Sequence, residues 1–194
     1  MHISEGVLSP PVLAAGWTLA AGGLAIGLKK TPVEKLPETA LVSAVLFLAS
    51  LVHVPIGPSS IHLTLLGLAG IMLGWSAIPA LFIALFLQGL LFQFGGILSL
   101  GVNMVSMGAA AIVGYYVFHA IPAKAKALGA FAGAFTAVLT GTVIVVTALF
   151  LSANDLKAAA ALLFAANLPL AAVEGVISVF IVTFLSKMIP SYVS

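Results

Sequence analysis

The chain has 194 residues, of which 62% are hydrophobic and only 6% are charged. A soluble domain carries about 25% charged residues. This composition leaves too little polar surface to cover a globule in water, and it indicates one integral membrane domain over residues 1–194. The chain has no cysteine and its basic residues are all lysines. Disulfides, thiolate metal sites and thiol catalysis are therefore excluded, and nucleic acid is disfavoured as a partner.

Apolar stretches of about 20 residues are needed to cross a bilayer as a helix, and the sequence holds about seven candidates. We expect spans at residues 12–28, 40–54, 62–75, 80–94, 102–118, 128–151 and 168–185, with a short interfacial or re-entrant helix at 158–166. Glycine and proline interrupt the third and fourth spans. The expected fold is an all-α integral membrane protein, a bundle of about seven transmembrane helices.

The lysines predict the orientation of this bundle. With seven spans, only Lys157 lies on one side, and the other side carries Lys29, Lys30, Lys35, Lys124, Lys126 and Lys187. Basic loops face the cytoplasm. We therefore expect a multi-pass protein of the inner (cytoplasmic) membrane, with its N-terminus outside and its C-terminus in the cytoplasm.

The first two residues form a potential metal chelate. No lysine or arginine precedes Lys29, so we expect Met1 to be retained and not removed with a leader. The α-amine, the His2 backbone nitrogen and the His2 imidazole then close two fused rings around an ion, with a fourth position left open. Planar nitrogen coordination suits Ni(II) or Cu(II). His53 and His62 lie on the expected outer side, whereas His119 ends the fifth span on the other.

Each of these histidines alone is more often hydrogen-bonded than metal-bound, and the residues alone leave that choice open. Glu5 is expected to orient the ligands at the chain start, unless it is a surface acid. Asn103, Ser106 and Met107 share one face of the fifth span, where they bond either the terminus or another helix. Glu174 is the one acid expected at membrane depth, as a gate or as a partner of the short helix.

Four segments carry a resemblance to a known family. They are MHISEG, GPSSIHLTLLG, QGLLFQFGGILSLGVNMVSMG and NLPLAAVEG, and in this order the chain resembles the CbiM/NikM family. Members are the substrate-capture (S) components of energy-coupling factor (ECF) transporters for cobalt and nickel. The resemblance implies an inserted N-terminal segment and a metal site made of Met1, His2 and His62. His53 matches no required ligand of the family, and Phe94 stands where some members have a histidine.

The resemblance also implies a function and partners. The chain would capture Co(II) or Ni(II) as a transported substrate, with nickel favoured by planar ligands and with no organic cofactor. Its partners would be a transmembrane T component, two cytoplasmic ATPase subunits and often a small accessory membrane protein. The chain has no GxxxxGK[ST] motif of its own.

Two other classes of function compete with this reading. A stand-alone secondary metal-ion transporter or channel, driven by an ion gradient, would require paired acidic residues within the membrane. An intramembrane enzyme is disfavoured because the chain has no GxSxG motif and no acid flanks Ser60 and His62. We therefore expect that the chain is not an enzyme.

Overall fold

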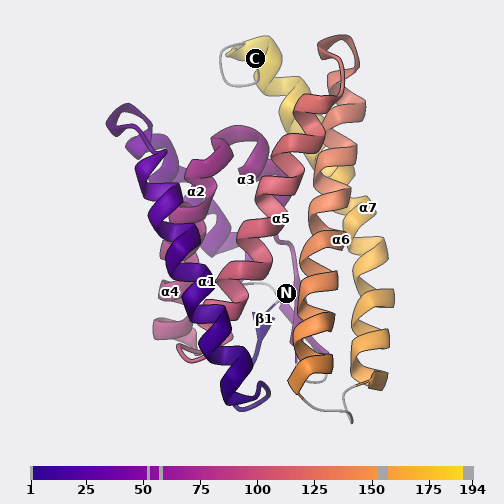
Figure 1. Ribbon diagram of the computed structural model, residues 1–194. Helices are drawn as coiled ribbons and strands as arrows, with labels where there is room; N and C mark the ends of the chain where they lie inside the picture. Colours follow the sequence, from indigo (N-terminus) through magenta and orange to yellow (C-terminus); the bar gives the residue numbers. More distant parts are fainter. Residues whose placement is uncertain (1, 52, 57–58, 153–156, 190–194) are drawn as a thin grey trace.

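The computed structural model describes residues 2–51, 53–56, 59–152 and 157–189, and most of them are helical (Figure 1). The helices are α1 (Pro10–Lys29), α2 (Leu36–Ala49), α3 (Leu66–Leu73), α4 (Ala77–Phe92), α5 (Leu100–Ala120), α6 (Lys126–Ser152) and α7 (Lys157–Met188). The strands are β1 (His2–Ile3), β2 (His53–Ile56) and β3 (Ser59–His62). Short 3₁₀ turns are η1 (Val33–Lys35), η2 (Gly74–Ser76) and η3 (Ala123–Ala125).

The predicted helical membrane bundle is confirmed. Among the described residues, five helical stretches are long and apolar enough to cross a membrane, namely Pro10–Lys29, Leu66–Phe92, Leu100–Ala120, Ala123–Ser152 and Ala159–Met188. The expected number of seven spans is approximate, because α2 has 14 residues and α3 only eight. At about 1.5 Å per residue, neither reaches across a bilayer of about 30 Å alone.

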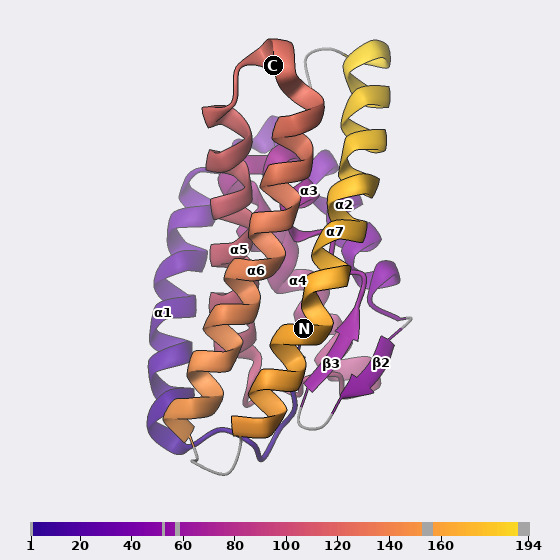
Figure 2. The same ribbon diagram turned by 90° about the vertical axis from the view of Figure 1, so that its right-hand side faces the viewer.

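The helices alternate in direction, and the basic segments gather at one end. The α1–α2 connection, the α5–α6 connection and the C-terminal end lie at the top of Figure 1, whereas β1 lies in the lower half. The upper end thus carries Lys30, Lys35, Lys124, Lys126 and Lys187. Figure 2 shows α6 and α7 side by side, with β2 and β3 at the lower edge of the bundle.

Two predicted boundaries were wrong. The third span does not begin at His62, because that residue ends β3 and Leu65 adopts a left-handed conformation (φ +52°) before α3 begins. The separate short helix at 158–166 does not exist, since α7 is continuous with Pro169 inside it. Such prolines are tolerated in membrane helices where neighbouring groups satisfy the freed backbone carbonyl.

The segment after α2 was expected to connect two spans, yet it contains two strands that pair with each other. β2 and β3 pair antiparallel, with His53 opposite His62. β1 adds to the other side of β3, so the sheet order is β1-β3-β2. The start of the chain is therefore a strand inserted among the helices.

Close helix packing depends on glycines where backbones meet. A Cβ on Gly101 of α5 would lie 2.6 Å from the backbone nitrogen of Trp17 of α1. A Cβ on Gly114 of α5 would lie 2.9 Å from the carbonyl oxygen of Gly133 of α6. Small residues at such points allow membrane helices to approach, and here they bring α5 to the centre of the bundle.

Candidate metal-binding site

The inserted strand brings two histidines together. β1 pairs with β3 in a register that sets His2 opposite Ser60 and Ile3 opposite Ser59. Nε2 of His62 lies 3.1 Å from Nδ1 of His2, and both side chains are buried. The two rings are nearly parallel, with centroids 4.7 Å apart and 15° between their planes.

The separation of these nitrogens fits two ligands of one ion. Adjacent ligands in a square arrangement are about 2.8 Å apart when each metal–nitrogen bond is about 2.0 Å. A pair already 3.1 Å apart would need only a small inward movement to share an ion. Without an ion, one ring donates a proton to the other.

The tautomer of His62 follows from its second hydrogen bond. Its Nδ1 lies 3.0 Å from the carbonyl oxygen of Leu63. A carbonyl can only accept, so Nδ1 carries the proton and Nε2 presents its lone pair. The second nitrogen of a metal-binding histidine is commonly held in this way. His62 is therefore oriented to offer Nε2 towards His2.

Asn103 of α5 holds the inserted strand from the side opposite β3. The backbone nitrogen of Ile3 donates to its Oδ1 (2.9 Å), and its Nδ2 donates to the Ile3 carbonyl (3.2 Å). The amide thus replaces a neighbouring strand for both backbone groups of Ile3, which is fully buried. Ser106 Oγ donates to the Asn103 carbonyl (2.9 Å) on the same helix, and Met107 lies in the apolar core.

Two glycines before α5 make room for the chain start. Gly95 and Gly96 have φ of +77° and +79°, a region that suits glycine. A Cβ on Gly95 would lie 3.4 Å from the Cβ of His2, and one on Gly96 would collide with the Glu5 side chain. Glu5 Oε1 accepts from the backbone nitrogen of Leu98 (2.8 Å). Glu5 therefore ties the chain start to the α4–α5 loop.

Some predicted site residues lie elsewhere or outside the described part. Met1 is outside the described residues, and so is the side chain of His53. His119 lies at the upper end of α5, where its Nδ1 donates to the Tyr115 carbonyl (2.8 Å). Among the residues that the structure describes, no group of three or more His, Cys, Asp or Glu side chains could hold a metal. A chelate that uses backbone nitrogens does not need such a group.

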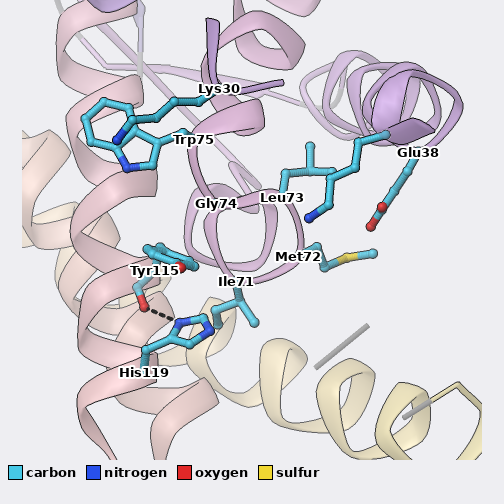
Figure 3. A pocket seen from close by; sticks show the side chains of 10 residues that line it. Lys30, Glu38, Ile71, Met72, Leu73, Gly74, Trp75, Tyr115 and His119 are labelled. Carbon is cyan, nitrogen blue, oxygen red and sulfur yellow. Dashed lines mark hydrogen bonds between the residues drawn. The ribbon is translucent and has the colours of Figure 1, made fainter. Parts of the chain in front are cut away.

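Figure 3 shows a pocket of about 620 Å³ near the ends of α1 and α5, which lie at the top of Figure 1, whereas β1 with His2 lies in the lower half. Lys30 sits over the ring of Trp75, 4.1 Å from its centroid. The pocket is lined by Lys30, Lys35, Glu38, Ile71, Met72, Leu73, Gly74, Trp75, Tyr115 and His119. The pocket and the paired histidines are therefore separate features.

Glu174 of α7 meets a partner that sequence reasoning missed. Its carboxylate accepts from the hydroxyl of Thr64 (2.7 and 2.9 Å) and also from the Thr64 backbone nitrogen. Both side chains are buried. The signal for such a partner was the acid itself, because a carboxylate at membrane depth needs donors. Its position along the chain did not indicate which residue supplies them.

Comparisons with known proteins find relatives of this chain among metal transport proteins. A family model described as "Cobalt uptake substrate-specific transmembrane region", CbiM, matches residues 2–192. A "Putative metal transport protein" of Haemophilus influenzae is 39% identical over 98% of this chain and 95% of its own. A "Fused nickel transport protein NikMN" of Rhodobacter capsulatus is 30% identical over 66% of this chain and 39% of its own.

A solved structure has the same fold. The crystal structure of a transition metal transporter aligns with a TM-score of 0.81 and 30% identity, covering 97% of this chain and 93% of that one. The family match extends over nearly the whole chain, through the inserted strand, β3 and α5. The chain thus belongs to the CbiM family of cobalt-uptake, substrate-specific transmembrane proteins.

Proposed function

We propose that this chain captures Ni(II) or Co(II) as the substrate-specific membrane component of an ECF-type importer. The observation that carries the proposal is the buried contact between His2 and His62, at 3.1 Å between nitrogens. The ligands would be the Met1 amine, the His2 amide nitrogen and Nδ1, and Nε2 of His62. Asn103 and Glu5 would hold this chelating segment in place. Ser106 donates to the backbone carbonyl of Asn103 on its own helix and not to the amide that holds Ile3, so its contribution would be small.

The ligand chemistry favours nickel over cobalt. Four nitrogens in a plane, one of them a deprotonated amide, suit a d⁸ ion. Co(II) can occupy the same ligands, and Cu(II) would bind more tightly by the Irving–Williams order. Exclusion of copper would then depend on its availability. The ion is the transported substrate, and we assign no organic cofactor and no catalytic role.

The charge distribution and the relatives support an orientation and a set of partners. Lysines at the upper end support a cytoplasmic C-terminus in the inner membrane, with the histidine pair in the outer half. A fused relative of R. capsulatus supports assembly with other transporter subunits. We propose a T component and two ATPase subunits as partners, often with a small accessory membrane protein.

A stand-alone secondary transporter is the competing function. It would move ions by means of titrating acids within the membrane. Glu174 is already engaged by Thr64, which argues against that mechanism. Metal uptake by vesicles that contain this chain without ATPase subunits would favour the alternative.

Metal binding by the purified, metal-depleted protein tests the proposal directly. We expect one Ni(II) per chain by elemental analysis, and loss of the ion in His2→Ala and in a variant extended before Met1. His119→Ala is the matched control, because His119 lies at the opposite end and bonds its own helix. One retained Ni(II) per chain in His2→Ala, with the protein still folded, would contradict the proposal.

A further inference from the structure

We propose that Glu174 is a positioning residue that sets the His62 arm of the metal site by holding Thr64. This inference rests on the proposed function, since it assigns a role within the same site. The hydrogen bonds that Glu174 accepts from Thr64 do not reach His2 or His62 directly. Its influence would pass through the short segment that joins β3 to α3.

The carboxylate binds this segment at its centre. Thr64 follows His62 by two residues and donates to Glu174 through both its hydroxyl and its backbone nitrogen. Glu174 is fully buried, so these donors replace the water that a carboxylate would otherwise require.

The segment needs an external support because regular structure stops on both sides of it. β3 ends at His62, α3 begins at Leu66, and Leu65 between them is left-handed. Residues 63 and 64 belong to neither a strand nor a helix, and Leu65 joins α3 as its cap, with its carbonyl accepting from the Ala69 backbone nitrogen (2.9 Å). The carboxylate also lies where α3 begins, and negative charge is favourable at a helix N-terminus.

The direction of the His62 ring depends on that same segment. Nδ1 of His62 bonds the carbonyl of Leu63, so rotation of this peptide would turn Nε2 away from His2. Metal ligands must be held to within about 0.5 Å of the productive geometry. The support therefore passes from Glu174 to Thr64, then to the Leu63 carbonyl, and so to the imidazole.

Next to Glu174, α7 packs closely against α6. A Cβ on Gly175, the residue after Glu174, would lie 2.7 Å from the ring of Phe131 of α6. The glycine thus lets α7 approach α6 where the carboxylate points towards Thr64. A residue 110 positions away in the chain can therefore act as a fixed support for the β3–α3 segment.

Nickel titration of the full-length protein tests this role. We expect Glu174→Ala to weaken Ni(II) binding by about 10- to 100-fold, as loss of groups that orient metal ligands commonly does. Glu174→Gln keeps an oxygen that accepts from Thr64, so it should recover most of the affinity. Thr64→Val removes only the hydroxyl and should fall between the wild type and Glu174→Ala. Both conservative variants keep the test valid if Glu174→Ala does not fold.

A double-mutant cycle and the absorption spectrum separate positioning from general stability. If Glu174 acts through His62, Glu174→Ala combined with His62→Ala should bind as His62→Ala does. The ligand-field bands of Ni(II) in Glu174→Ala should shift in the same direction as in His62→Ala. Additive losses, a wild-type spectrum in Glu174→Ala, or a Gln variant as weak as the Ala variant would overturn the inference.

The same series distinguishes this inference from the proposed function. Failure of the wild type to bind Ni(II), or wild-type binding by His62→Ala, would count against the site itself. Weakened binding in His62→Ala with unchanged binding in Glu174→Ala would defeat only the role given to Glu174.

Discussion

The anchoring of β1 by Asn103 makes a quantitative prediction about metal affinity. We consider Asn103→Leu, which keeps a side chain of similar size and removes both hydrogen-bonding groups. The Ile3 nitrogen would lose an acceptor at 2.9 Å, and the Ile3 carbonyl would lose a donor at 3.2 Å. Ile3 is fully buried, so water does not readily replace either partner.

The expected magnitude follows from these two bonds. A net contribution of about 1 kcal/mol each gives about 2 kcal/mol for insertion of the strand. This corresponds to about a 30-fold change in the insertion equilibrium. Apparent affinity falls with the population of the binding-competent state. We therefore expect Ni(II) affinity to fall by up to about 30-fold.

Competition against a chelator of known affinity measures the effect on purified protein. Ser106→Ala is the matched control, because Ser106 is buried on the same helix but donates only to the Asn103 carbonyl. We expect this control to bind within about twofold of the wild type, since a helical backbone carbonyl keeps its other partner. Wild-type affinity in a folded Asn103→Leu protein, alongside weakened His62→Ala, would refute the anchoring argument.

Three further outcomes are expected. Gly101→Ala places a methyl group 2.6 Å from the backbone nitrogen of Trp17 and should destabilise the fold by about 1–3 kcal/mol in thermal unfolding. Gly22→Ala, with no neighbour within 4 Å, should change stability by less than about 0.5 kcal/mol; equal melting temperatures would contradict this. Gly95→Ala should weaken Ni(II) binding, because its methyl group would lie 2.8 Å from Asn103 Nδ2 at a φ of +77°. Gly6→Ala shares the strain (φ +82°) without a neighbour within 4 Å, so equal losses of affinity in both would show that strain alone is responsible. Ni(II) affinity should fall on acidification, because the nitrogen ligands must lose protons and binding releases them; titrations at two pH values with the same dissociation constant would argue against these ligands.

Part of the candidate metal site could be predicted from the sequence. A histidine beside a terminal amine can be recognised as a chelate from covalent connectivity alone, and His62 was a candidate partner from its place after the second span. Asn103 was expected to bond either the inserted terminus or another helix, because a polar side chain in a membrane span needs a partner. In the structure Asn103 hydrogen bonds to Ile3, which lies 100 positions away in the chain. Thr64 was missed because nothing local marks the donor of a distant carboxylate.

Composition and local order determined the class of this protein: a helical membrane bundle whose basic loops lie at one end. Hydropathy is a sum over neighbouring residues, so long spans such as α5 and α6 could be located from the sequence. Only the tertiary structure decided that β2 and β3 pair beside β1, that α7 continues through Pro169, and that Thr64 donates to Glu174. These features depend on hydrogen bonds and packing between segments that meet only when the chain folds, and no local pattern records such contacts.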